Sequence, residues 1–379
     1  MRGWPIDEGA PEGRSPLTGA WAYPVALLSE RALGHNIELM ARYCREHGAL
    51  LAPHVKTTMA PRIIDAQLAA GAWGVTVAHV GQARALREHG NDGRIVIANE
   101  VITPGELSWV AADGRTLIYV DSVEGVRAAA SSGAPLSVLL EVGYAGGRTG
   151  CRSREEALAV AREVTATDTL RLAGVAAFEG LLEDGVDAFL GEVAAVAEAV
   201  RDLLQPEFLL TAGGSAYFDR VVAVLGPAAE RLGGRLLLRS GCYVTHDHGV
   251  YERTGPGARG ALEGAFEPAL EVWAPVLSRP EAGRALVGAG KRDLAYDMGL
   301  PIALPELVRD GERLALAPAR VVALNDQHAH LELDARADLR PGDLVGFGIS
   351  HPCSLFDRWR RLALVDEDRR VLEMISTLF

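Results

Sequence analysis

A repeating pattern of short apolar runs and longer helical segments between residues 50 and 240 constrains the fold most strongly. Each run is rich in β-branched residues, and each following segment has its apolar residues at helical spacing. Strands that alternate with helices imply right-handed βαβ crossovers and a parallel sheet. Eight such runs predict a (β/α)8 TIM-type barrel, for which this span is short but sufficient. The predicted strands are 50–55, 74–78, 94–98, 116–120, 136–142, 172–178, 207–212 and 236–240.

Helical patterns fill the gaps between these strands. An open, doubly wound sheet is the rival architecture, but no GxGxxG dinucleotide loop follows the first strand, so we favour the barrel. A further helix over 30–47 precedes the first barrel strand. The predicted helices between the strands are 60–70, 80–89, 104–112, 123–131, 154–165, 186–204 and 217–225.

The texture of the sequence changes after residue 265, where strand-like segments are separated by turn signals with little helix between them. This pattern predicts a mainly antiparallel β domain. A strand-like segment at 20–28 could pair with that domain. We therefore predict an N-terminal segment (1–28), a barrel (29–262) and a C-terminal β domain (263–379). The predicted strands of the β domain are 270–277, 284–287, 320–324, 330–333, 343–347 and 362–365.

Composition excludes several classes of protein. The 379 residues carry a net charge of −12 without a basic block, so we expect no nucleic-acid partner. The four cysteines form no CxxC pair, which argues against a disulfide framework or a zinc ribbon. No apolar run approaches a membrane span, and residues 1–18 lack the apolar core of a signal peptide. We expect a cytoplasmic protein that does not bind membranes.

Lys56 is the first candidate for chemistry, because it follows the first predicted barrel strand. Barrel enzymes hold their active sites at the C-terminal ends of the strands. Desolvation there favours a neutral amine, which can act as a nucleophile or form a Schiff base. The chain contains only two lysines, Lys56 and Lys291, whereas arginine supplies nearly all the positive charge. A lysine retained in such a chain is better explained by a need for its amine than by a surface role.

Glycine-rich turns follow the seventh and eighth predicted strands, at 211–215 and 240–243. In this architecture the loops after those strands commonly bind phosphate through backbone N–H groups. One glycine pair alone usually marks a turn, but two at these strands favour a phosphate site. A lysine and a phosphate cradle at one barrel mouth fit pyridoxal phosphate bound as a Schiff base.

Two further segments offer weaker signals. Arg148 lies in the glycine-rich loop 143–150 and could donate to an anionic oxygen, or it could be a solvated side chain. His351 and Cys353 are two residues apart, so on extended backbone they would face one ion, a pair suited to zinc. A packed His beside a buried Cys is an equal alternative. His328 and His330 are candidate neighbours, and the cluster 246–248 is expected to be structural.

Taken together, these segments resemble the fold-type III pyridoxal phosphate enzymes of the alanine racemase-like group. More narrowly, the chain is similar to the D-serine dehydratase/D-threonine aldolase family from about residue 20 to the C-terminus. The most specific motifs are Pro-His-Val-Lys-Thr at 53–57, Gly-Arg-Thr-Gly at 147–150 and Ser-His-Pro-Cys at 350–353, followed by Phe-Asp-Arg-Trp at 356–359. The Thr58-Met59 pair departs from the His-Lys of many members, which points to a separate subgroup.

The resemblance implies roles for individual residues. Lys56 would be the Schiff-base lysine and catalytic base, and Arg148 would contact the phenolic oxygen of the cofactor. His351 and Cys353 would match the metal pair of the dehydratases, usually zinc, with manganese as the alternative. Aldolase members more often carry an acidic residue at the position of Cys353. The residues implied to surround the cofactor phosphate are Gly213, Gly214, Ser215, Gly241, Cys242 and Tyr243.

These roles predict a metal-dependent lyase acting on D-β-hydroxy amino acids, most simply a D-serine dehydratase-like enzyme that forms a 2-oxo acid and ammonia. Retro-aldol cleavage to glycine and an aldehyde is the first alternative, and amino-acid racemisation without a metal is the second. A non-enzymatic pyridoxal phosphate carrier is disfavoured, because such carriers are single barrels and this chain has an added β domain. The resemblance further implies a homodimer.

Overall fold

The computed structural model describes residues 2–7 and 9–379; residues 1 and 8, within the predicted N-terminal segment, lie outside the described residues. The chain forms two compact units. We call them the barrel unit (Met40–Lys56 and Ile64–Gly241) and the sheet unit (Met1–Leu39, Thr57–Ile63 and Cys242–Phe379). The chain crosses between the units at the Lys56–Thr57 and Gly241–Cys242 peptide bonds, among other points. The domain boundaries predicted at 28/29 and 262/263 stay a prediction.

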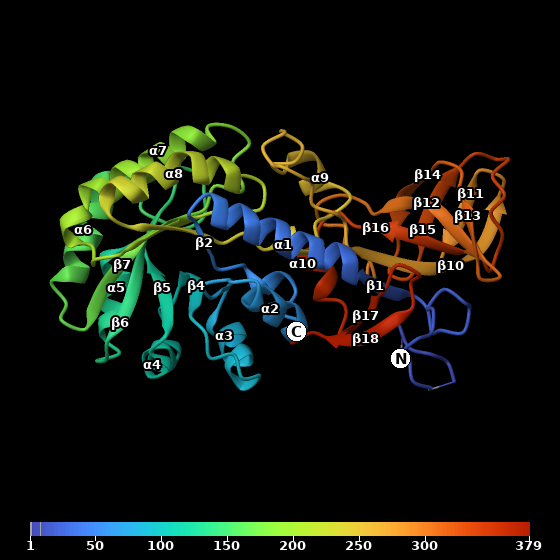
Figure 1. Ribbon diagram of the computed structural model, residues 1–379, viewed down its shortest axis with the longest axis horizontal. Helices are drawn as coiled ribbons and strands as arrows, with labels where there is room; N and C mark the ends of the chain where they lie inside the picture. The colour runs from blue at the N-terminus through green and yellow to red at the C-terminus, as the bar shows by residue number, and fades with distance from the viewer. Residues whose placement is uncertain (1, 8) are drawn as a thin grey trace. The chain divides into compact units, whose positions relative to one another are not determined.

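The barrel unit contains an eight-stranded parallel sheet in the order β2-β9-β8-β7-β6-β5-β4-β3 (Figure 1). Between the end strands the ring closes through the parallel bridge His54↔Thr76 and a hydrogen bond from Thr76 N to Pro53 O of 2.8 Å. The predicted (β/α)8 barrel is therefore confirmed. Its strands are β2 (Leu50–Leu51), β3 (Val75–Val77), β4 (Ile95–Glu100), β5 (Thr116–Val120), β6 (Leu136–Val142), β7 (Leu170–Ala177), β8 (Leu209–Ala212) and β9 (Arg235–Leu238).

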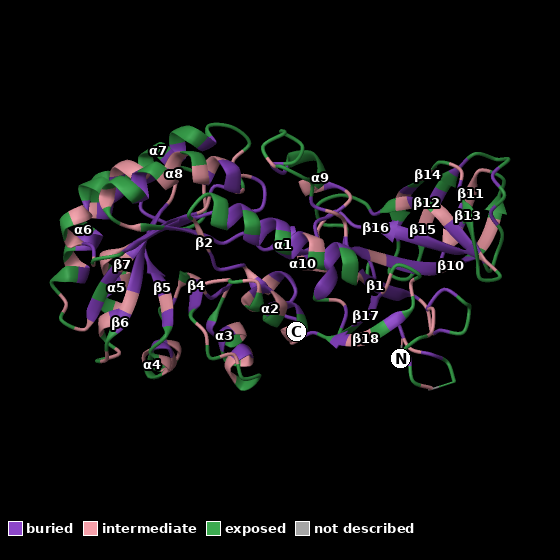
Figure 2. Ribbon diagram, in the orientation of Figure 1, coloured by how far each residue is buried: buried purple, intermediate pink, exposed green. Residues whose placement is uncertain are grey.

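Helices surround these strands, and their exposed faces turn outward while the strands are buried (Figure 2). Several begin where the sequence supplies a cap: the Ser122 and Ser153 side chains accept hydrogen bonds from the N–H groups of Gly125 and Glu156. The helices are α1 (Glu30–Glu46), α2 (Pro61–Ala69), α3 (Val80–Glu88), α4 (Pro104–Asp113), α5 (Val123–Ala130), α6 (Arg154–Thr165), α7 (Val186–Ala199) and α8 (Phe218–Leu232), with short 3-10 turns η1 (Val55–Thr57) and η2 (Arg201–Leu203).

A cluster of buried apolar side chains packs between the strands of the barrel unit. Parallel strands covered on both faces need mostly apolar residues, as the sequence of this unit has. The buried members of the cluster come from all but one of the strands or their immediate ends: Ala52, Val96, Tyr119, Leu139, Ala176, Leu209 and Leu237. The interior is thus a packed core that positions the strand ends rather than an open channel.

The sheet unit is built on a mainly antiparallel sheet in the order β13-β12-β16-β10-β1-β17-β18, to which β11, β15 and β14 are added (Figure 1). Strand β1 (Val25–Ser29) pairs antiparallel with β10 and parallel with β17. The other strands are β10 (Leu270–Glu281), β11 (Arg284–Val287), β12 (Ile302–Arg309), β13 (Glu312–Ala315), β14 (Ala319–Leu324), β15 (Ala329–Leu333), β16 (Leu344–Gly348), β17 (Arg361–Val365) and β18 (Val371–Ser376). Three short helical elements, η3 (Cys242–Val244), α9 (Val250–Thr254) and α10 (Pro352–Phe356), complete the unit.

The mainly antiparallel β domain is confirmed, but some predicted elements differ. The first barrel strand is predicted over 50–55, whereas β2 ends at Leu51, because Pro53 offers no N–H to the ladder and the chain turns into η1. Strands β12, β13 and β18 are not predicted; β12 contains Pro305, and all residues of β13 are exposed and lack an apolar face. Among the described residues, no helix combines the length and apolar character needed to cross a bilayer.

Candidate active site

Lys56 lies just beyond the C-terminal end of β2, in the turn η1, and is half-buried. Its neighbour His54 has a ring nitrogen, Nδ1, that is shielded from solvent and has no hydrogen-bond partner. Burial holds the pKa of His54 well below its usual value, and the positive charges of Lys56 and Arg239 add to this effect. The imidazole beside the lysine is therefore neutral, and one of its ring nitrogens is left without a partner.

Three carboxylates meet at the ends of neighbouring strands. Glu100 ends β4, Asp121 follows β5 and Glu141 lies near the end of β6, and one oxygen from each lies within 4.8 Å of the others. Neither oxygen of Glu100 has a hydrogen-bond partner, and Oε2 of Glu141 is also unpartnered. Burial, Glu141 and Asp121 raise the pKa of Glu100 to about 8. Glu100 can therefore keep a proton near neutral pH and share it with a neighbouring oxygen or a ligand.

The loop that carries Arg148 is held in shape by Arg152. The guanidinium of Arg152 donates to the carbonyl oxygens of Thr149 and Gly150, each at 2.7 Å. Gly150 has a positive φ of 100°, and a Cβ there would lie 2.4 Å from the backbone nitrogen of Gly143, so only glycine fits. Arg148 itself is exposed and stacks its guanidinium over a phenyl ring, 4.4 Å from the ring centroid of Phe178. The loop thus presents a cation from a fixed backbone.

A second arginine, Arg239, is buried just after β9. It donates from Nε to Thr211 Oγ1 at 2.9 Å and from Nη2 to the carbonyl oxygen of Ala177, and its guanidinium lies 5.6 Å from the ring centroid of Tyr119. The hydroxyl of Tyr119 is buried without a hydrogen-bond partner, and burial raises its pKa. A buried cation and an unpartnered hydroxyl at the same barrel end are groups that an anionic or ring-nitrogen ligand would satisfy.

The glycine turn after β8 is organised differently from the prediction. The N–H groups of Gly213 and Gly214 donate to the two oxygens of Glu179, at 3.1 and 2.6 Å. Glu179 is fully buried, and burial raises its pKa. Ser215 is buried in the same turn, and Gly241 follows β9 as the last residue of the barrel unit. Phosphate binding by these residues stays a prediction.

The sheet unit brings two cysteines and a histidine together. One ligand atom from each of Cys242, His351 and Cys353 lies within 4.8 Å of the others, and the two Sγ atoms are 3.4 Å apart. Cys242 belongs to η3, whereas His351 caps α10 and Cys353 lies in its first turn. The pair 351/353 is therefore not on extended backbone as expected; the start of a helix brings the side chains together. Tyr243, the last of the residues predicted near the phosphate, is buried beside Cys242 in η3.

The charges in this cluster depend on one another. Although burial opposes it, contacts with Cys353 and Asp297 raise the pKa of His351 to about 9. A hydrogen bond with Cys242 and contact with His351 hold the pKa of Cys353 well below its usual value, whereas contact with Cys353 and burial raise that of Cys242. Cys353 is thus the thiolate that a soft metal ion needs.

Of the remaining predicted candidates, Asp247 and His330 have hydrogen-bond partners, whereas Nδ1 of His248 is buried without one. Asp247 accepts hydrogen bonds from the N–H groups of Gly249 and Tyr251, at 2.8 and 3.0 Å, and so caps α9 as expected for a structural residue. His330 is held by Arg284 at 2.8 Å and Asn325 at 2.7 Å. Within the described part of the chain, His328 and His330 are not among the grouped potential ligands.

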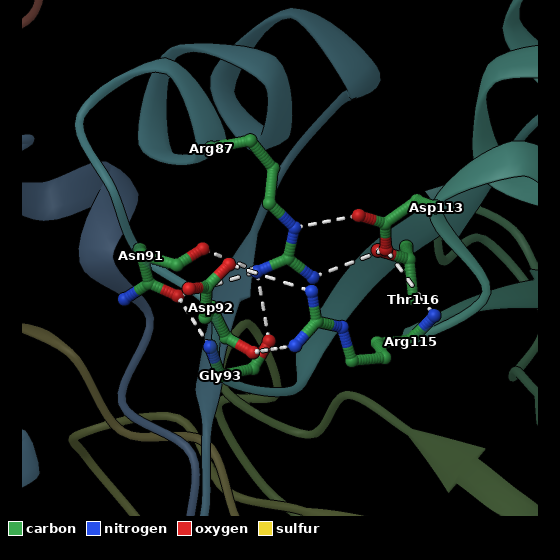
Figure 3. A network of polar contacts seen from close by, with 7 residues as sticks. All are labelled: Arg87, Asn91, Asp92, Gly93, Asp113, Arg115 and Thr116. Carbon is green, nitrogen blue, oxygen red and sulfur yellow. Dashed lines mark hydrogen bonds and ion pairs between the residues drawn. The ribbon is translucent and has the colours of Figure 1, made fainter.

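A cavity of about 820 Å³ opens at the other end of the barrel. The starts of the strands line it, among them Leu50, Thr116, Leu136 and Arg235. An ion-paired network borders it, in which Arg87 holds Asp113 and the 91–93 turn (Figure 3). In this architecture that face contributes to stability, so the cavity is not the candidate site.

Reasoning from the sequence missed several residues at the site. A polar residue that ends an otherwise apolar strand is the signal that could have found most of them. Two others lie in segments with no such signal: Asp297 bonds to His351, and Thr57 contacts Cys353. The missed residues at or near the strand ends are Glu100, Tyr119, Asp121, Glu141, Glu179 and Arg239.

Comparisons with known proteins bear on this arrangement. The alanine racemase N-terminal domain family matches residues 28–224, and a serine dehydratase domain family matches residues 269–365. A D-threonine aldolase of Arthrobacter is 27% identical over 320 residues, covering 80% of this chain and 78% of that protein. A 3-hydroxy-D-aspartate aldolase of Paracoccus denitrificans is 26% identical over 340 residues, 84% of each chain. A D-threo-3-hydroxyaspartate dehydratase of Delftia is 28% identical over 295 residues, 73% of each chain.

Solved structures extend the likeness to nearly the whole chain. The crystal structure of a D-threonine aldolase from Filomicrobium marinum superimposes with a TM-score of 0.81 at 27% identity, covering 97% of this chain and 98% of that one. An alanine racemase-like protein from Idiomarina loihiensis, at 19% identity, shares the fold with a TM-score of 0.74 over 96% of this chain and 99% of its own.

Proposed function

The chain belongs to the alanine racemase-like family of fold-type III pyridoxal phosphate enzymes, and on that basis we propose that it is a metal-dependent lyase for D-β-hydroxy amino acids. Within that class we assign it to dehydration, in the manner of a D-serine dehydratase, with a 2-oxo acid and ammonia as products. The observation that carries this choice is the thiol of Cys353 beside His351, because a thiolate selects a soft Lewis acid such as zinc. Manganese is the alternative ion.

The C-terminal end of the barrel fits pyridoxal phosphate. Unpartnered buried polar atoms of His54, Glu100, Glu141 and Tyr119 lie at that end, which is what the removal of a polar ligand would leave. The bound cofactor would supply an electron sink for charge that develops at the substrate Cα. The residues that would hold the cofactor are Lys56 at its aldehyde, Arg148 at its phenolic oxygen, and Gly213, Gly214, Ser215, Gly241, Cys242 and Tyr243 around its phosphate.

Glu179 modifies the phosphate part of this proposal. A carboxylate that accepts hydrogen bonds from the N–H groups of Gly213 and Gly214 competes with a phosphate for the same donors. Because burial raises the pKa of Glu179, a proton can neutralise it at modest cost, and it would then donate rather than repel. The backbone of the turn would thus be oriented by Glu179, and N–H groups further along the loops would meet the phosphate.

Lys56 would have two tasks. Its amine would bond to the cofactor, and after a substrate amine displaced it, the free amine would take the α-proton of a D-amino acid. Burial keeps the imidazole of His54 neutral, so this neighbour adds no positive charge beside the amine.

His351 and Cys353 would hold the metal ion. A bound zinc ion would act as a Lewis acid on the substrate β-hydroxyl, which is otherwise a poor leaving group. His351 Nδ1 lies 2.6 Å from Asp297 Oδ2, so Nε2 is the ring nitrogen that would bind the ion. Thr57 directly follows Lys56 in the chain, and its Oγ1 lies 3.3 Å from Cys353 Sγ.

Retro-aldol cleavage is the second candidate, and the relatives favour it. Three of the similar proteins named above are aldolases, two for D-threonine and one for 3-hydroxy-D-aspartate. The same side chains would serve that reaction if the β-hydroxyl proton, rather than the α-proton, were removed. A single substrate separates the two reactions.

The deciding experiment is incubation of the cofactor- and zinc-loaded protein with D-threonine. Formation of 2-oxobutyrate and ammonia supports dehydration, whereas glycine and acetaldehyde would replace it with the aldolase assignment. Appearance of an L-isomer without either product would favour racemisation. EDTA should abolish a lyase reaction, and D-alanine, which has no β-hydroxyl, is the matched control substrate that should yield no product.

The same proposal covers the setting of the enzyme. We expect a cytoplasmic homodimer that binds a small D-amino acid as its substrate. We expect it to bind neither nucleic acid nor membranes. Sedimentation of the holoenzyme at micromolar concentration would test the dimer.

A further inference from the structure

We infer that Cys242 is a third protein ligand of the metal ion, so that the centre is a Cys2His site with one position open. This inference rests on the proposed function, which assigns only His351 and Cys353 to the ion. Three protein ligands with one open position are the arrangement of catalytic zinc sites, because the open position receives water or substrate.

The separations of the donor atoms fit one ion. In a tetrahedral zinc site with Zn–S of about 2.3 Å and Zn–N of about 2.0 Å, two sulfurs lie about 3.8 Å apart and a sulfur and nitrogen about 3.6 Å apart. The Sγ atoms of Cys242 and Cys353 are 3.4 Å apart, and all three potential ligand atoms lie within 4.8 Å of one another. A disulfide would bring the sulfurs to about 2.05 Å. The observed spacing is close to that of two ligands of one ion.

The surroundings orient the three ligands toward one point. Asp297 bonds to Nδ1 of His351 and is itself bonded by the hydroxyl of Ser354, which is the carboxylate–histidine arrangement that supports metal ligands. On the other side, Thr57 Oγ1 lies 3.8 Å from Cys242 Sγ and 3.3 Å from Cys353 Sγ. Cys242 is buried in η3, and its thiol faces that of Cys353 there.

The third ligand changes the charge of the centre. Two thiolates and one imidazole balance the two positive charges of a zinc ion, and the thiol protons that binding displaces are released to solvent. With Cys353 as the lone thiolate, the ion and its ligands would carry one net positive charge, next to the carboxylate of Asp297. A second thiolate directs the metal preference further toward soft ions and away from manganese.

Cobalt(II) reports the number of thiolate ligands directly, without any measurement of activity. We propose titrating cobalt(II) into the full-length, metal-free, reduced protein and recording the sulfur-to-cobalt charge-transfer absorbance per bound ion. The inference predicts that Cys242→Ser lowers this absorbance to about half that of the wild type, as Cys353→Ser also does. Cys44→Ser is the matched control, because Cys44 is a buried free thiol outside the cluster and its variant should keep the full absorbance.

Two outcomes overturn the inference. Full absorbance in Cys242→Ser would show that the thiol is not a ligand and would leave the His351–Cys353 pair of the proposed function intact. Absence of the band in the wild type would overturn both the inference and the metal part of the proposed function. Should Cys242→Ser fail to fold, as judged by far-UV circular dichroism, X-ray absorption of the zinc-loaded wild type counts the ligands instead. Two sulfurs support the inference, and one sulfur refutes it.

Discussion

The two ends of the barrel differ in whether their buried carboxyl groups have hydrogen-bond partners. At the N-terminal end, Arg87 donates to both oxygens of Asp113, at 2.6 and 3.0 Å, and to the carbonyl oxygens of Asn91 and Gly93 (Figure 3). Burial opposes ionisation of Asp113, but the hydrogen bonds from Arg87 and Thr116 prevail and lower its pKa. At the C-terminal end, Glu100 is without a hydrogen-bond partner, and its pKa is raised to about 8.

The difference separates stability from function. A buried charge that is fully paired stabilises the fold around it, whereas an unpaired one weakens the fold and persists where a ligand completes it. At one end of the barrel the buried polar groups are paired and stabilise the strands. At the other end some of them are unpaired and available to a ligand. Each prediction below changes one end and measures the property assigned to it.

The largest effect is expected for Lys56→Ala at the functional end. Loss of the amine should lower turnover of D-β-hydroxy amino acids by more than about 10³-fold, because both the bond to the cofactor and the base are removed. Borohydride reduction followed by mass spectrometry should find cofactor mass on the Lys56 peptide of the wild type and none on the variant. Lys291→Ala, which removes the other lysine of the chain, is the control and should keep both properties. Retention of activity and label by Lys56→Ala would contradict the site assignment.

The next effect concerns the stabilising end. Arg87→Ala should lower the free energy of unfolding by about 3 kcal/mol, because it leaves the buried Asp113 without its partner; the two side chains are 14% and 7% exposed. Arg115→Ala, whose pair with Asp92 is 54% and 83% exposed, should cost less than about 1 kcal/mol. Urea denaturation measures both. Equal losses in the two variants, or a large fall in turnover by folded Arg87→Ala, would break the distinction between the ends.

A further effect at the functional end is a pH dependence that arises from Glu100. Its pKa is about 8 in the folded protein against a usual value of 4.5, so between these values the folded state binds a proton that the unfolded state lacks. The free energy of unfolding should therefore fall as pH rises from 5 to 8, by at most about 1.4 kcal/mol per pH unit and by less because solvent partly screens the carboxyl. Glu100→Gln should flatten this slope in urea titrations of the cofactor-free protein.

Glu183→Gln provides the control for that slope, since Glu183 is an exposed carboxylate of the same unit. It should retain the wild-type dependence on pH. If Glu100→Gln retained the slope too, the unpaired acids at the functional end would not be the groups that titrate.

Much of the barrel could be predicted from the sequence, because its strands are buried on both faces. Continuous apolar runs such as 95–98 stand out against helices in which apolar residues recur at helical spacing among polar ones. The sheet unit was harder. Its edge strand β13 has no buried face, and β12 contains a proline, so the local pattern carries little information about either.

The candidate site divides in the same way. Lys56 stands out because lysine is nearly absent from the chain. The His351–Cys353 pair stands out because two residue types that bind metals lie two positions apart. Neither residue scarcity nor spacing in the sequence identifies the residues that contact them. Asp297 and Cys242 lie more than 50 residues from His351, and Arg239 is one of many arginines until the fold buries it.

The sequence by itself determined the barrel, the antiparallel domain that follows it and the scarce amine and thiol that suggest chemistry. Periodicity and residue scarcity are local or compositional properties, and a reader of the chain has full access to them. Only the tertiary structure decided which carboxylates are left unpaired, that Glu179 occupies the N–H groups of the glycine turn, and that Cys242 faces Cys353. Burial, pairing and the distance between two sulfurs depend on contacts between residues far apart in the chain, and these exist only after folding.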